Sequence, residues 1–378
     1  MKKKVALIFL LLLILTSCSS NQTPEQAFIK SVHPRSSVYD NCYVTVSSNT
    51  LTYYDLDTGV STPVCSAAGC RHDGSNSNCT AIIENEILSN PFRYAGKLYY
   101  FGFGDNQESR MYKCEENGSS RETVLEFKRS GNDEEYISPM IFSTELYGDK
   151  IYLLILESVM SKSYEFDGNY SYGTSGMANY KIGCYDLVTD SYSVIYETGI
   201  CPDSNMQIYG IYNDMIYANF GGNTKQYEFD TFDDRIAAIE DENSEYNKTK
   251  FRKTLKISTK DGSVSESDSQ MEWYVASSAG CWYMLGNSLY TADGTYIAEA
   301  YSMYATEDGL IYYDYDCENV YLYNDGVVKS APFSQRIFFE SRDYYVCDYS
   351  NETGTYYYCT KESYFSGAPE YRELEMKQ

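Results

Sequence analysis

The sequence predicts an all-β protein built as a β-propeller, and two observations carry this prediction. Tyrosine supplies 42 of the 378 residues, and it occurs in short aromatic and β-branched segments that are typical of strands. Turn sequences such as Asp-Gly and Thr-Gly separate these segments, and glycine supplies the positive φ that tight hairpins require. The same order of strands and turns recurs along the chain, which is the sequence signature of a repeat architecture.

The clearest copy of this pattern lies at residues 307–333. Asp308-Gly309 is predicted to form a turn, and residues 310–315 (LIYYDY) form an aromatic strand. A second strand follows at residues 320–323, and Asn324-Asp325-Gly326 then turns the chain into a third. The copy therefore has the form of an antiparallel meander.

Seven such copies occur, and a further strand-like segment precedes several of them. About four strands in each of seven copies predict a propeller of seven four-stranded antiparallel sheets, with six or eight as alternative numbers. A pair of β-sandwiches and an open β-solenoid are the alternative architectures. The other six copies cover residues 42–59, 96–118, 148–187, 213–262, 281–294 and 344–360, and the preceding strands lie at residues 136–142, 272–275 and 336–339.

Residues 1–17 are predicted to be a signal peptide. Three lysines precede an apolar run at residues 5–15, which is shorter than the roughly 20 residues that a membrane-spanning helix needs. The run ends in Leu15-Thr16-Ser17-Cys18, which resembles the lipobox of bacterial lipoproteins. The resemblance implies that Cys18 is lipidated and anchors the chain at the outer face of the cytoplasmic membrane. An ordinary cleaved signal with a chance cysteine is the alternative.

Residues 18–37 are polar and contain two prolines, so we expect a flexible tether before a propeller domain at residues 38–378. Without the signal peptide the chain has 54 acidic and 27 basic residues, a net charge of −27. Such a surface repels nucleic acid, which is excluded as a partner. We expect a monomer.

Two insertions interrupt the repeats. Residues 157–180 are rich in Ser, Gly and Tyr and are predicted to form a long loop, either a binding loop or a solvated hairpin tip. Residues 230–250 are predicted to form a helix that begins at Asp230 or Thr231. Its apolar face would comprise Phe232, Ile236, Ile239 and Tyr246. The basic residues that follow, between positions 248 and 260, are expected to neutralise nearby carboxylates.

One segment has an unusual chemical composition. Cys65, Cys70, His72 and Cys79 follow the pattern C-x4-C-x-H-x6-C. Three cysteines and one histidine are a ligand set that tetrahedral zinc accepts, although this spacing is not that of a common zinc finger. The sequence leaves three alternatives open: a structural zinc site, a disulfide between two of the cysteines, and free thiols.

The number of cysteines limits the disulfide alternative. Of the twelve cysteines, the lipidated Cys18 leaves eleven, so they cannot all pair within one chain. Several lie where other copies carry apolar residues, and we expect these to pack as small hydrophobic side chains. They are Cys114, Cys184, Cys281, Cys317 and Cys347.

No catalytic motif is found, so no catalytic residue is predicted. His72 is the only histidine of the predicted domain, which argues against histidine-based acid–base chemistry. The pairs Asp55/Asp57 and Asp314/Asp316 are interpreted as turn residues. The many acidic residues nevertheless leave a hydrolase with paired carboxylates as an alternative.

The run GLIYYD at residues 309–314, with the hairpin and Asp-Gly that follow, resembles the blades of YWTD-type and TolB-like propellers over residues 39–376. With the lipobox and the Cys-Cys-His loop, the whole chain resembles a group of propeller lipoproteins from Gram-positive anaerobes. Propellers have many functions, so this resemblance implies a fold and a location more than an activity. We expect a membrane-anchored extracytoplasmic binding protein for a protein, peptide or glycan. The alternative is a surface enzyme that acts on polysaccharide through paired carboxylates in the propeller centre.

Overall fold

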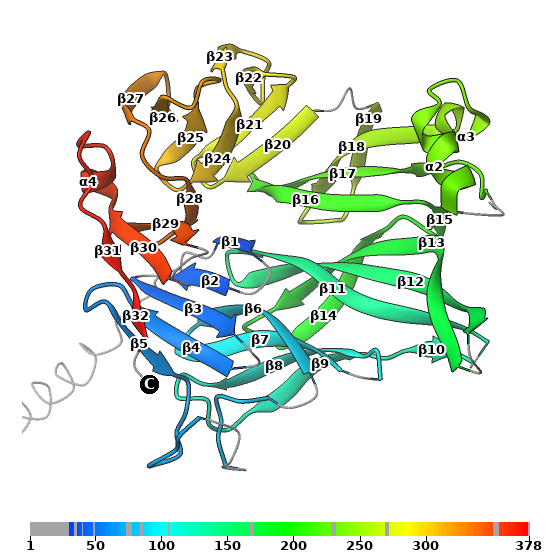
Figure 1. Ribbon diagram of the computed structural model, residues 1–378, viewed down its shortest axis with the longest axis horizontal. Helices are drawn as coiled ribbons and strands as arrows, with labels where there is room; N and C mark the ends of the chain where they lie inside the picture. Colours follow the sequence, from blue (N-terminus) through cyan, green and yellow to red (C-terminus); the bar gives the residue numbers. More distant parts are fainter. Residues whose placement is uncertain are drawn as a thin grey trace, which may run out of the picture.

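The computed structural model describes residues 30–33, 36–39, 41–47, 50–72, 78–83, 86–104, 106–132, 134–166, 169–227, 232–268, 272–350 and 355–376 (Figure 1). These residues form seven sheets that follow one another around a ring. Each pair of strands is antiparallel except β5 and β32. The predicted class, an all-β propeller of four-stranded antiparallel sheets, is confirmed.

The first three sheets contain the first half of the chain and its last strand. The first sheet has the order β1 (Lys30–His33), β2 (Ser36–Tyr39), β3 (Cys42–Ser47), β4 (Thr50–Asp55), β5 (Val60–Pro63) and β32 (Glu375–Met376). The second comprises β6 (Glu86–Tyr94), β7 (Lys97–Gly104), β8 (Ser109–Glu115) and β9 (Glu122–Phe127). The third comprises β10 (Ser130–Gly131), β11 (Glu135–Tyr147), β12 (Lys150–Phe166), β13 (Asn169–Asp186) and β14 (Ser191–Glu197), with β15 (Cys201–Pro202) beside β13.

The other four sheets have four strands each. The fourth comprises β16 (Asn205–Tyr212), β17 (Met215–Asn223), β18 (Lys250–Ser258) and β19 (Val264–Asp268), and the fifth β20 (Glu272–Ser277), β21 (Gly280–Leu285), β22 (Ser288–Thr291) and β23 (Tyr296–Glu299). The sixth comprises β24 (Ser302–Thr306), β25 (Gly309–Tyr313), β26 (Asn319–Asn324) and β27 (Val327–Pro332), and the seventh β28 (Ile337–Glu340), β29 (Tyr344–Ser350), β30 (Thr355–Thr360) and β31 (Arg372–Glu373).

The aromatic strands that the sequence predicts occupy equivalent positions. Residues 98–101, 151–155 and 310–313 lie in β7, β12 and β25, and each of these strands is paired to the innermost full-length strand of its sheet. In β25, Leu310 and Tyr312 pack against the fifth sheet, whereas Ile311 and Tyr313 pack against the seventh. Successive side chains of a strand point to opposite faces, so the continuous apolar run is explained by burial on both faces.

Seven apolar clusters join each sheet to the next. Leu98 and Tyr100 pack with Val44 and Leu51 between the first and second sheets, and equivalent clusters occupy the following interfaces. The last cluster joins Phe339, Val346 and Tyr358 of the seventh sheet to Tyr54 and Leu56 of the first. The ring is therefore closed by the same kind of packing that connects its other sheets.

Backbone pairing also closes the ring. Leu374, which is buried, brings the chain from β31 in the seventh sheet to β32, and β32 pairs in parallel with β5 of the first. Nearby, Asn41 Nδ2 donates to Asp343 Oδ2 at 2.8 Å, and the Tyr344 hydroxyl donates to Asp57 at 3.1 Å. Both chain ends of the described propeller thus lie in the first sheet.

Some tyrosines also form hydrogen bonds between neighbouring sheets. The hydroxyl of Tyr94, the last residue of β6, donates to Asp149 in the turn of the third sheet at 2.7 Å. The equivalent Tyr147 donates to Asp214 of the fourth sheet at 3.0 Å. Burial, together with the bond to Asp149, raises the pKa of Tyr94. Tyrosine therefore places its ring between sheets while its hydroxyl bonds the next turn.

The first sheet begins earlier than the sequence predicts. The predicted tether, residues 18–37, overlaps β1 and the first residues of β2. The backbone of β1 pairs with β2 and lies against β11 and β28, the innermost strands of the third and seventh sheets. The polar composition of this segment suggested a linker, but strand pairing at the inner edge of a sheet does not require an apolar pattern.

Of the two alternatives for residues 157–180, the structure shows the hairpin. Strands β12 and β13 continue through this segment and pair from Lys150↔Asp186 to Phe166↔Asn169. The segment is therefore a long antiparallel hairpin that extends from the third sheet (Figure 1). Its composition did not predict strands of this length, because glycine is depleted in strands.

The predicted helix at residues 230–250 is divided into α2 (Phe232–Glu240) and α3 (Glu245–Lys248). Ser244 caps α3 by accepting a hydrogen bond from Asn247 N at 3.1 Å, and Tyr246 is buried. Ile239 is exposed, so the predicted continuous apolar face does not form. The predicted caps Asp230 and Thr231 lie outside the described residues. A third short helix, α4 (Lys361–Tyr364), follows β30. In the part of the chain that the structure describes, no helix is long and apolar enough to cross a membrane.

The burial of the second strand on both faces can be tested in one sheet. Leu310 in β25 is fully buried, whereas Val327 in β27 of the same sheet is 71% exposed. We expect Leu310→Ala to lower the free energy of unfolding by about 2–5 kcal/mol, as measured by urea denaturation. The matched change Val327→Ala should cost less than about 0.5 kcal/mol. Equal losses for the two variants would contradict the packing described.

Candidate metal centre

The connection between β5 and β6 contains all four residues of the Cys-Cys-His segment. It extends from the outer edge of the first sheet toward the second, on the outside of the ring (Figure 1). Residues 73–77 of this connection lie outside the described part of the chain. The site is therefore remote from the centre of the propeller.

Leu51 closes the base of this connection at both ends. Val64 N donates to Leu51 O, and Leu51 N donates to Ala81 O, each at 2.9 Å. Val64 and Ala81 are buried, and Val64 and Ile83 pack in the cluster between the first two sheets. The two ends of the loop are therefore fixed side by side, which brings Cys65 close to Cys79.

Thr80 connects the loop to the second sheet. Its hydroxyl accepts from Ser66 N at 3.0 Å and lies 3.3 Å from the carbonyl oxygen of Asn117, in the turn between β8 and β9. The guanidinium of Arg121 donates to Thr80 O at 2.6 Å. A Cβ at Gly118, which has φ +79°, would lie 2.5 Å from Val64 O. Glycine is required there because the turn approaches the loop backbone so closely.

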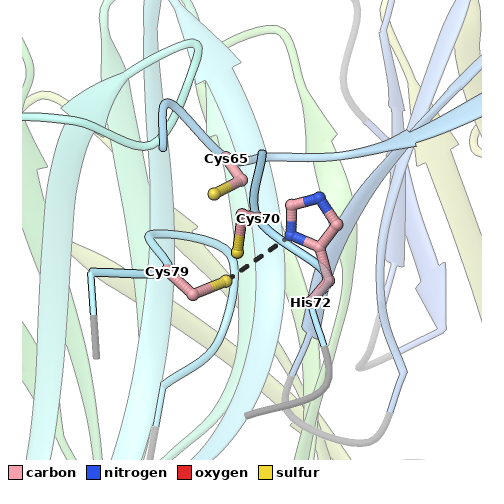
Figure 2. A group of neighbouring side chains, drawn as sticks. All are labelled: Cys65, Cys70, His72 and Cys79. Atoms are coloured by element: carbon pink, nitrogen blue, oxygen red, sulfur yellow. Dashed lines mark hydrogen bonds between the residues drawn. The ribbon is translucent and has the colours of Figure 1, made fainter. Parts of the chain in front are cut away.

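The structure brings the four predicted residues together (Figure 2). The three sulfur atoms and one ring nitrogen all lie within 4.8 Å of one another, and Cys79 Sγ is 3.6 Å from His72 Nδ1. His72 has a φ of +56°, an uncommon conformation for a residue other than glycine. That conformation directs its ring toward the sulfur atoms.

The loop gives two of the thiols different acidities. Burial alone would raise the pKa of Cys65, but hydrogen bonds from the backbone of Ala67 and from Thr80 lower it to about 6. Burial raises the pKa of Cys79 to about 11, and its hydrogen bond with Cys70 acts in the same direction. The thiolate is the form that binds metals, so the hydrogen bonds to Cys65 favour its binding form.

No disulfide joins any of the eleven cysteines among the described residues. Three sulfurs and one imidazole nitrogen are soft and borderline ligands, which suit zinc rather than calcium or magnesium. All four side chains are partly buried. Sequence reasoning thus identified residues that converge, whereas metal binding itself stays a prediction.

The other predicted residues have structural contacts. Asp55 Oδ1 accepts from the backbone N–H of Asp57 and Thr58, and Asp314 Oδ1 accepts from Glu318 N and Asn319 N. These contacts agree with the interpretation of both Asp pairs as turns. Four of the five cysteines expected in strands are buried, whereas Cys317 lies in a turn with φ +55° and is partly exposed. The lipidation site Cys18 lies outside the described residues.

The predicted role of the basic cluster near residue 250 is confirmed for several members. Lys253 pairs with Glu266 at 2.6 Å, and Lys260 pairs with Asp214 at 2.5 Å. Both acids lie in the same sheet as these lysines. The cluster is thus not an isolated basic patch on an acidic surface.

One buried ion pair was missed by sequence reasoning. Glu340, the last residue of β28, is fully buried, and its Oε1 accepts from Lys361 Nζ at 2.8 Å and from Glu307 N at 3.2 Å. Burial opposes the charge of Lys361, but Glu340 and Asp308 outweigh it and raise the pKa of the amine. This carboxylate therefore joins the sixth and seventh sheets.

Fold and site define a β-propeller that carries a Cys3His cluster on its outside. No family model and no curated protein matches the chain. Among solved structures, acylaminoacyl peptidase of Pyrococcus horikoshii is similar over 94% of this chain and 53% of its own, with 14% identity and a TM-score of 0.50. This chain thus spans about half of that peptidase, and at this identity the likeness shows the fold alone.

Two further structures are similar with TM-scores below 0.5. The β-propeller domain of the trilobed protease from Pyrococcus furiosus is similar over 92% of this chain and 98% of its own, with 12% identity and a TM-score of 0.44. Oligogalacturonate lyase from Vibrio parahaemolyticus is similar over 92% of this chain and 86% of its own, with 11% identity and a TM-score of 0.45.

The buried ion pair gives a stability prediction. Glu340→Gln removes the buried one of the two carboxylates that face Lys361 and leaves Asp308 as its acidic partner. We expect a loss of about 1–3 kcal/mol in the free energy of unfolding. The double variant Glu340→Leu/Lys361→Met, which removes both charges, should recover most of this loss. As a control, Lys253→Met breaks an exposed pair and should cost under about 1 kcal/mol. A Glu340→Gln protein as stable as the wild type in urea would show that the pair is not structural.

Proposed function

We propose that this chain is an extracytoplasmic lipoprotein whose propeller is a binding scaffold rather than an enzyme. The anchor is Cys18, at the end of a signal peptide with a lipobox. The described ring starts at Lys30, so residues 19–29 could extend for at most roughly 40 Å. The propeller would therefore work close to the outer face of the membrane.

Trp273 is the observation that supports a binding role. In β7, β12, β17, β21 and β25, the fifth residue pairs with a residue of the innermost long strand of the same sheet. The five partner residues therefore lie at one level of the ring. Trp273, which is 63% exposed, is the only aromatic residue among the five. The partners are Ser89, Ser143, Gln207, Trp273 and Ser302.

A second exposed aromatic ring lies at the same level of the next sheet, and a third lies in the turn that follows β25. Tyr301 N donates to Tyr313 O at 2.8 Å, which places Tyr301 beside the fifth residue of β25, and Tyr315 follows two residues later. Tyr301 and Tyr315 are 51% and 59% exposed. The guanidinium of Arg336 lies 5.3 Å from the centre of the Tyr301 ring. We call Trp273, Tyr301, Tyr315 and Arg336 the aromatic rim.

The chemistry of the aromatic rim favours a neutral glycan as ligand. Flat aromatic faces pack against the apolar C–H face of a sugar, while tyrosine hydroxyls and a guanidinium donate hydrogen bonds to its oxygens. The net charge of −27 after removal of the signal peptide would repel acidic polymers. A polysaccharide-degrading enzyme with central carboxylates is the rival function. This rival is disfavoured because β1 lies between the innermost long strands of the third and seventh sheets. Its backbone therefore takes up space at the centre of the ring, where the paired carboxylates would have to bind substrate.

Anchoring is tested by Cys18→Ala. We expect the variant either to be released into the medium or to remain as an unprocessed precursor of altered mobility, because it cannot accept the lipid. Fractionation and electrophoretic mobility of the two proteins measure this. A variant that stays in the membrane with the mobility of the wild type would refute the lipoprotein assignment.

Glycan binding is tested by tryptophan fluorescence. The chain has two tryptophans, of which Trp273 is exposed and Trp282 is buried, so a ligand on the aromatic rim should change mainly the emission of Trp273. We would titrate neutral oligosaccharides, acidic oligosaccharides and extended peptides. For a neutral oligosaccharide we expect Trp273→Ala to weaken binding at least tenfold, as measured by calorimetry.

The matched control is Tyr296→Ala, which removes an exposed aromatic ring from β23 at the outer edge of the same sheet. Its affinity should equal that of the wild type. Binding of peptides alone would replace the glycan by a peptide as ligand. Binding that Trp273→Ala leaves unchanged would exclude the aromatic rim as the site.

A further inference from the structure

We propose that Cys65, Cys70, His72 and Cys79 bind one Zn²⁺ ion, and that this ion fastens the outer edge of the first sheet to the second. This site is independent of the glycan-binding surface proposed above. It lies at the outside of the ring, whereas the aromatic rim belongs to the fifth and sixth sheets. The ion would be structural rather than catalytic.

The four ligand atoms lie close enough together for one zinc ion. Atoms bound to one zinc at about 2.0–2.3 Å lie roughly 3.3–3.8 Å apart in a tetrahedron. The distance of 3.6 Å between Cys79 Sγ and His72 Nδ1 meets this requirement. Since no pair of ligand atoms exceeds 4.8 Å, the others need to approach by about 1 Å at most.

The ligand set identifies both the metal and its role. Three thiolates and one neutral imidazole make a closed four-coordinate site with no position left for water or substrate, as in structural zinc sites. A divalent ion with three thiolates carries a net charge of −1, which a half-exposed position tolerates. No carboxylate belongs to the four-residue cluster, so hard cations are not favoured.

A disulfide explains less of the geometry. It would join two sulfur atoms and leave the third cysteine and His72 without a reason to converge. Yet the imidazole of His72 faces the sulfur atoms from a backbone conformation with positive φ. A metal ion gives all four side chains one common partner.

The loop needs such a partner because little apolar surface holds it. Ser66, Ala68, Gly69 and Arg71 are exposed, and among the described residues of the loop Ala81 is the next buried one after Val64. Leu51 fixes the base of the loop, and the contacts of Thr80 with Asn117 and Arg121 attach that base to the second sheet. Zinc would extend this attachment from the base to the outer part of the loop.

Metal analysis of protein purified without oxygen tests binding directly. We expect about one zinc per chain in the wild type and less than a tenth of that in Cys70→Ser and in His72→Ala. The matched control is Cys317→Ser, which changes a partly exposed cysteine outside the cluster and should keep its zinc. Cobalt substituted into the wild type should give the visible absorption of a tetrahedral thiolate site.

Digestion with trypsin tests whether a bound zinc ion stabilises the loop. It uses the wild-type protein, so the result does not depend on whether a variant folds. Arg71 is exposed between two ligands, and cleavage after it requires the loop to open. We expect a zinc chelator to accelerate this cleavage at least tenfold, while the urea midpoint of the ring changes little. Added zinc should restore the protection.

Two results would overturn the proposal. One is protein purified without oxygen that contains no zinc and takes up none when zinc is added. The other is a peptide map of that protein which shows a disulfide between two of the three cysteines. Zinc that is bound but does not slow the cleavage after Arg71 would refute the structural role.

Discussion

Face-to-face packing between neighbouring sheets holds this ring together, and the second strand of each sheet is the element on which that packing depends. In β12, Ile151, Leu153 and Ile155 pack toward the second sheet while Tyr152 and Leu154 pack toward the fourth. No sheet can bury both faces alone, so each interface requires the next sheet. The seventh interface, between Phe339 and Leu56 among others, completes the cycle. Closure is thus a consequence of repeated burial, which β32 reinforces through its pairing with β5.

The same burial explains which parts of the fold were predictable. A strand buried on both faces reads as a continuous aromatic and aliphatic run, and residues 98–101, 151–155 and 310–313 carry that signal. Other segments lack this signal: residues 30–37 of β1 and β2 resembled a polar tether, and the composition of residues 157–180 did not predict the length of the β12–β13 hairpin. The helix at residues 230–250 was expected as one piece because its apolar spacing continues past Ser244. The capping serine interrupts it, since its hydroxyl satisfies the backbone of a new helix start.

The candidate sites divide in the same way. Cysteines and a histidine within 15 residues predicted the members of the Cys3His cluster, but their convergence depends on Leu51, which joins both ends of the loop. Glu340 gave no signal because its partner Lys361 follows another strand, and the pair forms only when the sixth and seventh sheets meet. Trp273 resembles any aromatic strand residue in the sequence. Only the register of five sheets shows that the other sheets carry small or polar residues at its level.

An additional attachment by zinc would stabilise the first sheet more than any other sheet. The first sheet contains the strands nearest to the proposed lipid anchor, β1 and β2, and it also receives the last strand, β32. Tension on a lipidated Cys18 would therefore reach this sheet before any other. Packing, the contacts of Asn41 with Asp343 and the pairing of β32 hold it to the seventh sheet. On its other side the Cys-Cys-His loop leads to the second sheet. A zinc ion there would strengthen the attachment on the side that lacks a strand shared between sheets, which gives a physical reason for a metal site far from any ligand-binding surface.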